Sequence, residues 1–133
     1  MTLYVLDTSA LVRLFVPDGP LPDGLESALD EAWRAEANLY VPELALAEMG
    51  QVLRKKEAAG YLGRDEVEEI LDAVLDLPLH AIAHRELLAA ALELARQRRA
   101  TVYDALFVVL AASRDGVLIT ADEEQRRIVD HPG

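Results

Sequence analysis

The stretch Thr2-Leu3-Tyr4-Val5-Leu6-Asp7-Thr8-Ser9 decides how this chain begins to fold. Its first five residues form a short apolar run, which predicts a buried β-strand at residues 2–6. Asp7, Thr8 and Ser9 then offer side chains that favour a helix N-cap, and residues 10–15 continue as the start of a helix. A buried strand that passes directly into a helix is typical of an α/β protein.

The same alternation of strand and helix continues along the chain. Further strands are predicted at residues 38–41, 79–83 and 117–120. Helices are predicted at residues 24–37, 43–59, 64–76, 84–99 and 104–115, and a last helix starts at Asp122. Short apolar strands separated by helices predict a parallel sheet with both faces covered. We therefore expect a three-layer α/β/α sandwich with a short, mainly parallel central sheet.

Three of these helices carry apolar patterns that predict how they are buried. The helix at 104–115 is almost entirely apolar, so it must be surrounded by protein. The helix at 64–76 has apolar residues at helical spacing, namely Val67, Ile70, Leu71 and Val74. The helix at 84–99 is expected to bury one face made of Leu87, Leu88, Ala91, Leu92 and Ala95.

Composition limits the possible functions. The chain has 133 residues, and we expect residues 1–133 to form a single domain. It has no cysteine, which excludes disulfides, thiolate zinc sites and cysteine nucleophiles. The apolar N-terminal segment carries Asp7 and Arg13 and lacks a basic lead-in, and no stretch is long enough for a membrane span. The expected location is the cytoplasm, with no membrane partner.

Four acids stand where a parallel sheet would bring them together. Asp7 follows the first strand, Asp122 follows the last strand after one intervening residue, Asp104 begins the buried helix, and Glu48 lies inside the helix at 43–59. Ligands in such sheets bind beyond the carboxyl ends of the strands. Each acid alone is also compatible with a helix cap or an exposed helix edge. Clustered carboxylates next to apolar segments repel one another, and a hard divalent cation removes that repulsion.

These residues resemble the PIN domains, and most closely the VapC-type toxins of bacterial toxin–antitoxin pairs. The resemblance covers essentially the whole chain and rests on four short motifs in order. They are Val5-Leu6-Asp7-Thr8-Ser9-Ala10-Leu11, Glu48 within residues 44–52, Tyr103-Asp104-Ala105-Leu106-Phe107, and Leu118-Ile119-Thr120-Ala121-Asp122.

The resemblance implies an endoribonuclease that depends on Mg²⁺ or Mn²⁺. Asp7, Glu48, Asp104 and Asp122 match the four catalytic, metal-holding acids of the family, and Thr8 and Thr120 match supporting hydroxyl positions. The metal would polarise a phosphodiester oxygen and lower the pKa of a water that attacks in line. The resemblance also implies a small antitoxin partner of VapB type and a homodimer. We expect the antitoxin, and not this chain, to recognise operator DNA.

The net charge of −11 is unusual for an enzyme that binds RNA. Candidate RNA-binding side chains are Arg13, Arg96, Arg98 and Arg99. They could equally be solvated groups at helix ends, where the helix dipole favours cations. The acidic surface could instead serve a basic protein partner.

Three other functions remain open from the sequence. The chain could be a free-standing RNA-processing PIN nuclease or a non-catalytic PIN scaffold, although a scaffold has no need of four acids that repel one another. Phosphoryl transfer through an aspartyl-phosphate at Asp7 is disfavoured, because Ser9 stands where a second acid would be needed. His80 and His84 are expected to have structural roles.

Overall fold

The centre of the molecule is a parallel sheet of four short strands. The structure is a computed structural model that describes residues 1–130. The strands are β1 (Thr2–Leu6), β2 (Ala37–Pro42), β3 (Leu79–Ile82) and β4 (Val117–Ile119). They pair in the order β3-β2-β1-β4, and every pairing is parallel. The predicted α/β fold with a short parallel sheet is confirmed.

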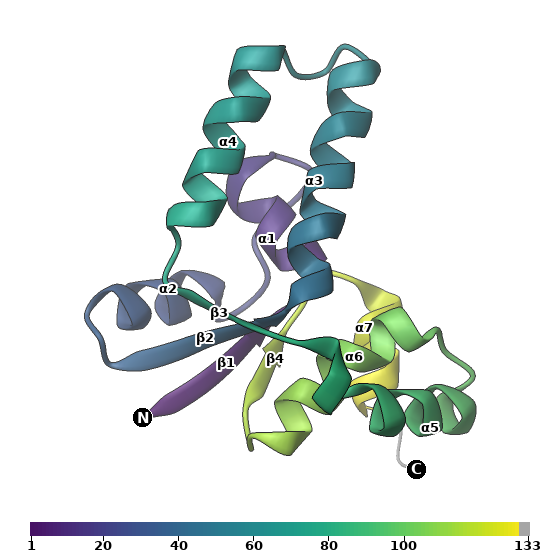
Figure 1. Cartoon of the computed structure of the whole chain (residues 1–133). Helices are drawn as coiled ribbons and strands as arrows, with labels where there is room; N and C mark the ends of the chain where they lie inside the picture. Colours follow the sequence, from purple (N-terminus) through teal and green to yellow (C-terminus); the bar gives the residue numbers. More distant parts are fainter. Residues whose placement is uncertain (131–133) are drawn as a thin grey trace.

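Helices connect the strands and cover both faces of the sheet (Figure 1). They are α1 (Thr8–Phe15), α2 (Leu25–Trp33), α3 (Glu43–Ala58), α4 (Arg64–Asp76), a 3₁₀ turn at His84–Glu86, α5 (Leu88–Arg98), α6 (Val102–Ser113) and α7 (Glu123–Asp130). Helices α2 and α3 pack against β2, whereas α6 packs against β1, β2 and β4. Right-handed crossovers place α1 to α4 on one face and α5 and α6 on the other. Helices α3 and α4 form a pair that rises beyond the sheet.

The strand order reverses beside β1. The chain moves from β1 to β2 and then to β3 in one direction, but it returns to place β4 on the other side of β1. The helices that leave β1 and β4 therefore diverge, and a crevice opens at the carboxyl ends of these two strands. Asp7 follows β1 and Asp122 follows β4 after two residues, so both acids reach this crevice.

Helix α6 is packed as its apolar sequence predicts. Ala105, Leu106, Phe107, Leu110 and Ala111 are buried. They join the core with Val5 and Leu6 of β1 and with buried residues of the other helices. Burying a Leu or Phe side chain contributes about 1.5–3 kcal/mol of stability. The start of α6 is therefore held firmly against the central strand, which fixes the position of Asp104.

Several predicted helix boundaries are corrected by the structure. The predicted helix at 84–99 is divided into a 3₁₀ turn and α5, because Leu87 donates to the carbonyl of His84 at 2.9 Å. The helix predicted at 24–37 ends at Trp33, because Ala35 adopts a left-handed φ of 57°. Helix α6 begins at Val102, two residues before the predicted start, because Thr101 caps it.

The buried face of α5 is narrower than predicted. Leu88 and Leu92 are 49% and 43% exposed, while Ala91 and Ala95 face the core. The small alanines let α5 approach α6 closely, so the larger leucines at the edge of that contact remain in solvent. On α4, Leu71 is likewise 38% exposed, whereas Val74 is buried.

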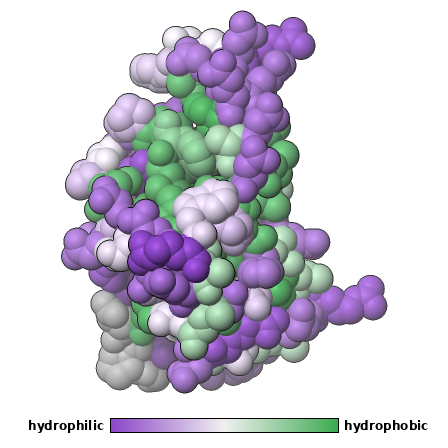
Figure 2. All heavy atoms as spheres, turned by 90° about the vertical axis from the view of Figure 1, so that its left-hand side faces the viewer, coloured by the Kyte–Doolittle hydropathy of each residue, from purple (hydrophilic) through white to green (hydrophobic). Residues whose placement is uncertain are grey.

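One face of the molecule carries an apolar patch between polar zones (Figure 2). This is the left-hand side of Figure 1, where α2 and α4 lie. Exposed large apolar side chains on these two helices are Trp33, Leu71 and Leu75. Across residues 1–130, none of the helices has both the length and the apolar character needed to cross a membrane.

Candidate active site

The structure brings the four predicted acids to one pocket. The pocket has a volume of about 100 Å³ and lies at the carboxyl ends of β1 and β4. Its lining residues are Asp7, Thr8, Ser9, Glu48, Asp104, Phe107, Asp122 and Gln125. The acids come from four separate segments of the chain, so only the tertiary fold could place them together.

Asp7 is the buried member of the set. Its side chain is 4% exposed and caps α1, because Oδ1 accepts a hydrogen bond from the Ala10 backbone N–H at 2.9 Å. Oδ1 also accepts from the Ser9 hydroxyl at 2.6 Å, and Oδ2 accepts from the Thr120 hydroxyl. Burial raises the pKa of Asp7, and the charge of Asp122 adds to the rise, while the three hydrogen bonds oppose it. A carboxylate is therefore held in fixed orientation where its charge is poorly solvated.

Two hydroxyl groups join the β1–α1 junction to the β4–α7 junction. Thr120 Oγ1, which donates to Asp7, accepts from the backbone N–H of Asp122 at 2.9 Å. Ser9 Oγ, which also donates to Asp7, accepts from the backbone N–H of Ala121 at 2.9 Å. Each hydroxyl acts as both donor and acceptor, so the two junctions are linked through Asp7 itself.

Glu48 reaches the pocket from the middle of α3. Its side chain is half-buried, and Oε1 accepts from the Thr8 hydroxyl at 2.6 Å. The two threonines predicted as supporting residues thus contact different acids: Thr8 contacts Glu48, and Thr120 contacts Asp7. Because Thr8 is the first residue of α1, this hydrogen bond also links α1 to α3.

Asp104 lies in the first turn of α6, and Asp122 directly precedes α7, which packs against α6. Asp104 is half-buried, and its backbone N–H donates to the hydroxyl of Thr101, which is the cap of α6. Burial raises the pKa of Asp104, with a further contribution from the charge of Asp122. Asp122 is exposed and caps α7, since its Oδ1 accepts from the Glu124 backbone N–H at 2.9 Å. Capping and membership of the acidic pocket are therefore compatible roles.

The donor chemistry of the pocket suits a hard divalent cation. The pocket offers carboxylate, hydroxyl and amide oxygens and no sulfur or imidazole, which is the set that Mg²⁺ and Mn²⁺ accept. Among residues 1–130, however, no three acidic or histidine side chains are arranged closely enough to share one ion as they stand. Coordination by three carboxylates would therefore require side-chain rotation.

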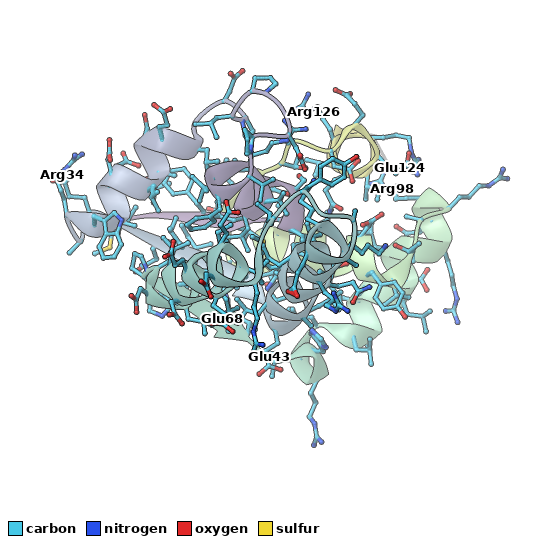
Figure 3. All side chains as sticks on the ribbon, turned by 90° about the horizontal axis from the view of Figure 1, so that it is seen from above. Arg34, Glu43, Glu68, Arg98, Glu124 and Arg126 are labelled. Atoms are coloured by element: carbon cyan, nitrogen blue, oxygen red, sulfur yellow. The ribbon has the colours of Figure 1, made fainter. Side chains whose placement is uncertain are left out.

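The predicted RNA-binding arginines lie outside the pocket lining. Arg13 donates to the carbonyl of Pro20 at 2.8 Å, and Arg96 pairs with Glu93 at 3.3 Å. Arg99 ends α5 in a left-handed conformation with φ of 52°. The carbonyl of Arg98 accepts from Arg127 at 3.1 Å. Arg98, Glu124 and Arg126 lie on the same side of the molecule, away from Arg34 (Figure 3).

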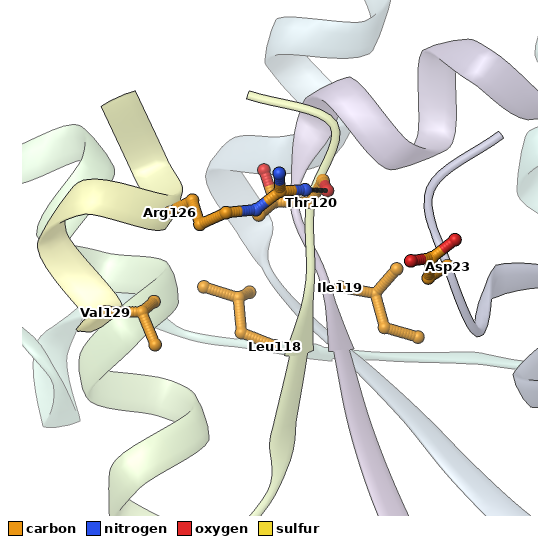
Figure 4. A pocket seen from close by; sticks show the side chains of 6 residues that line it. All are labelled: Asp23, Leu118, Ile119, Thr120, Arg126 and Val129. Atoms are coloured by element: carbon orange, nitrogen blue, oxygen red, sulfur yellow. Dashed lines mark hydrogen bonds between the residues drawn. The ribbon is translucent and has the colours of Figure 1, made fainter. Parts of the chain in front are cut away.

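Arg126 extends from α7 over the end of β4. Its Nη2 donates to the carbonyl of Thr120 at 3.2 Å, beside a cavity of about 270 Å³ on the outer side of β4 (Figure 4). Asp23, Leu118 and Val129 also line this cavity. Arg126 therefore braces the backbone next to the acidic pocket from its outer side.

Sequence reasoning missed the site roles of Ser9 and Gln125. Ser9 was expected only to help cap a helix, yet its hydroxyl contacts Asp7 and the backbone of Ala121. Gln125 lies in a charged segment that predicts an exposed helix, yet it is 2% exposed. For Ser9 the motif Asp7-Thr8-Ser9 was a usable signal, whereas nothing local marked Gln125.

His80 and His84 have structural contacts, and His131 lies outside the described residues. His80 and His84 stand four residues apart, a spacing that can form a metal site on a helix, but His80 lies in β3. The His80 ring contacts the Tyr40 ring with centroids 4.9 Å apart. His84 Nε2 accepts from the backbone N–H of Leu44 at 2.9 Å and so caps α3, the helix that carries Glu48.

The parallel sheet reverses its strand order beside β1, and four carboxylates line a pocket there. These features define a three-layer α/β/α protein with an acidic pocket at the carboxyl ends of its strands. A sequence profile of the PIN domain matches residues 4–130. The chain belongs to the PIN-domain family, as its four motifs implied.

Known relatives agree with this assignment. The chain is 33% identical over 124 residues to Ribonuclease VapC3 of Pyrobaculum aerophilum, covering 90% of this chain and 89% of the relative. The crystal structure of PAE2754 from Pyrobaculum aerophilum matches 97% of this chain and 81% of its own, with a TM-score of 0.75 and 25% identity. VapBC2 from Rickettsia felis, solved with a promoter DNA fragment, shares the fold at a TM-score of 0.68 and 20% identity, over 96% of this chain and 93% of its own.

Proposed function

We propose that this chain is a VapC-type endoribonuclease that hydrolyses RNA with Mg²⁺ or Mn²⁺ and acts as the toxin of a toxin–antitoxin pair. The observation that carries the proposal is the joint lining of one pocket by Asp7, Glu48, Asp104 and Asp122. The relative named Ribonuclease VapC3 supports the same activity. Asp7 and Asp122 also cap helices, but capping does not require four carboxylates to line one pocket of about 100 Å³.

The four acids of the pocket would have different roles because their surroundings differ. Asp7, which accepts three hydrogen bonds, would be a rigid ligand for the cation. Asp104 and Asp122 would complete the ligand set from α6 and α7. A bound divalent cation supplies charge neutralisation at the phosphodiester and a more acidic water. Glu48, whose carboxylate accepts a hydrogen bond from Thr8, would accept a proton from the attacking water or share in holding the cation.

The negative charge of the chain favours a basic inhibitor. With a net charge of −11, the acidic pocket would attract an arginine of a small VapB-type antitoxin. A guanidinium can bind a carboxylate in bidentate fashion and replace the charge of the metal. We also propose that the chain forms a homodimer, acts in the cytoplasm and leaves operator recognition to the antitoxin. Arg13, Arg96, Arg98 and Arg99 remain candidates for holding RNA phosphate.

A cleavage assay on bulk RNA tests the proposal. Cleavage is expected with Mg²⁺ or Mn²⁺ and is expected to stop in EDTA. Glu48→Gln should remove it, while Glu57→Gln should not, because Glu57 lies on the same helix but outside the pocket. Products should carry a 5′-phosphate, as attack by water with a 3′-oxygen leaving group requires. Products with a 2′,3′-cyclic phosphate would mean that the ribose hydroxyl is the nucleophile, and would refute the mechanism.

The isolated chain can also be tested for DNA binding. A gel-shift assay that compares the promoter DNA of its own gene with scrambled DNA should show no preference. Tight, sequence-specific binding by the chain alone would contradict the assignment of operator recognition to the antitoxin.

A further inference from the structure

Gln125 shares an unusual property with Asp7 and Thr120. Among the described residues, these are the polar or charged side chains that are buried, at 4%, 7% and 2% exposure for Asp7, Thr120 and Gln125. Asp7 and Thr120 are directly bonded to each other at the acidic pocket. Gln125 lines the same pocket from α7. Buried polar side chains are thus concentrated at the acidic pocket.

Gln125 lies on the buried face of α7. Its neighbours Glu124 and Arg126 are exposed, while Ile128, one turn later, is 1% exposed. Gln125 and Ile128 therefore form the inner face of a helix whose other side is charged. An apolar side chain at this position would avoid the cost of desolvating an amide. The amide is consistent with a role that an apolar side chain could not fill.

The contact that uses the amide is specific. Gln125 Nε2 donates to the backbone carbonyl of Asp104 at 2.7 Å. A carbonyl oxygen can only accept, so the nitrogen end of the amide must face it. The hydrogen bond joins α7 to the first turn of α6, between the helix that carries Asp104 and the helix that follows Asp122.

We infer that Gln125 is a positioning residue of the acidic site, whose buried amide fixes the separation between Asp104 and Asp122. The inference rests on the proposed function. The carboxylates of Asp104 and Asp122 repel each other, which would push α6 and α7 apart. The hydrogen bond from Gln125 to the Asp104 carbonyl opposes that movement. The neutral amide achieves this without adding charge. A glutamate there would place an acceptor against the Asp104 carbonyl and a fifth negative charge in the pocket.

Metal binding depends on this separation. Among residues 1–130 no three acidic side chains are close enough to share one ion as they stand, so their carboxylates would have to rotate toward it while α6 and α7 keep their spacing. Groups that orient metal ligands without touching the metal typically change metal affinity by about 10–100-fold when replaced. Gln125 acts on Asp104 through its backbone, so its loss should appear first in metal affinity.

The test is a calorimetric titration of the metal-free protein with Mn²⁺. Gln125→Met retains the length of the side chain but cannot donate, and it should weaken Mn²⁺ binding about tenfold. Ile128→Val is the matched control: it loosens the same inner face of α7 without touching the hydrogen bond. It should lower the melting temperature but leave Mn²⁺ affinity within about twofold, as expected for a change outside the ligand-orienting groups. RNA cleavage by Gln125→Met should recover as the Mn²⁺ concentration is raised.

The outcomes separate the two claims. Parent-like Mn²⁺ affinity in Gln125→Met overturns the positioning role, even if that variant melts earlier, and leaves the proposed nuclease function standing. Absence of Mn²⁺ binding by the parent refutes the metal-dependent function and the positioning role with it.

If Gln125→Met does not fold, Gln125→Asn retains the amide but shortens its reach, and the same loss of affinity is expected. In the metal-free parent, the side-chain NH₂ of Gln125 should also exchange slowly by NMR, and fast exchange would contradict the hydrogen bond.

Discussion

The β1–α1 and β4–α7 junctions use the same local device with different results. In each, an aspartate follows a strand and caps the next helix, Asp7 for α1 and Asp122 for α7. Asp7 is 4% exposed and accepts three hydrogen bonds, whereas Asp122 is exposed and caps through the Glu124 N–H alone. The capping motif therefore does not decide the surroundings of its carboxylate, because the burial of the preceding strand determines how far each aspartate is exposed.

The two junctions are nevertheless one unit. Thr120 donates to Asp7 and accepts from the Asp122 N–H, so a change at one junction reaches the other. Variants that remove a carboxylate, the Thr120 hydroxyl or the Asp122 cap should therefore affect the two junctions to different extents.

The largest effect is expected for Asp7→Asn. We expect RNA cleavage to fall at least about 100-fold, which corresponds to about 2.7 kcal/mol of activation free energy, because the amide cannot supply the fixed negative ligand. Asp122→Asn should reduce cleavage less, since water can replace an exposed ligand. The measurement is kcat/KM at saturating Mg²⁺ for both variants. Equal losses of kcat/KM in the two variants would show that the difference in burial between Asp7 and Asp122 does not affect their contributions to cleavage.

Thr120→Val tests the bridge between the junctions. Valine matches the shape of threonine but leaves the Asp122 N–H and Asp7 Oδ2 without this partner. Leaving a buried polar group unsatisfied costs about 1–3 kcal/mol, so the free energy of unfolding should fall by about 2 kcal/mol. Urea denaturation in EDTA measures this change. Thr120→Ser retains the hydroxyl and should be more stable than Thr120→Val, and a Thr120→Val variant as stable as the parent would show that the hydroxyl bridge contributes nothing measurable.

Asp122→Ala tests the exposed cap. Loss of an N-cap carboxylate typically destabilises a protein by about 1 kcal/mol. Asp122→Asn can still cap α7 and should lose only a few tenths of a kcal/mol. Thermal unfolding of both variants without metal gives the comparison. If alanine and asparagine prove equal in stability, the hydrogen bond to Glu124 contributes nothing measurable.

The smallest effect is expected in the pH dependence of Asp104→Asn. Burial raises the pKa of Asp104 in the folded protein, so the folded state holds this proton to higher pH than the unfolded chain, where an aspartate has a pKa of about 3.9. The free energy of unfolding of the parent therefore falls as the pH rises from about 3.9 toward the raised pKa of Asp104, and the asparagine variant lacks that loss. Without metal, the stability of the variant relative to the parent should therefore increase as the pH rises above about 4.

Two controls define that pH experiment. Asp72→Asn, an exposed change on α4, should show no such gain. Added Mn²⁺ should raise the melting temperature of the parent more than that of Asp104→Asn, because binding to the native state stabilises it. A variant that is less stable than the parent at pH 7 in EDTA would show that the charge of Asp104 favours folding. The structure already assigns the cap of α6 to Thr101, so capping would not explain such a result.

Sequence patterns predicted the elements whose signals are local. The first strand, at residues 2–6, and the helix at 64–76 were both predicted with the bounds that the structure has. The prediction of a helix at 84–99 was wrong at its start, because residues 84–86 form a 3₁₀ turn. In that turn the His84 ring accepts a hydrogen bond from the Leu44 backbone N–H and so caps α3. No property of residues 84–99 shows that contact.

The candidate site was predictable to a similar degree. The four acids could be chosen because each stands beside an apolar strand or helix and matches a family motif. Their common pocket followed from the parallel sheet. The hydrogen bonds of Ser9 and Gln125 could not be predicted, because their partners Ala121 and Asp104 lie far away in the chain.

By itself, the sequence determined the strands, most of the helices, the parallel sheet and the acids that line its carboxyl edge. These properties depend on apolar periodicity and on side chains next to each strand. Only the tertiary structure decided which acid is buried. The strand order β3-β2-β1-β4 places β1 inside the sheet and β4 at its edge. Asp7 therefore leaves a strand with neighbours on both sides, while Asp122 leaves one that is open to solvent. This difference in desolvation, which no local pattern encodes, makes one capping aspartate a buried carboxylate and the other an exposed one.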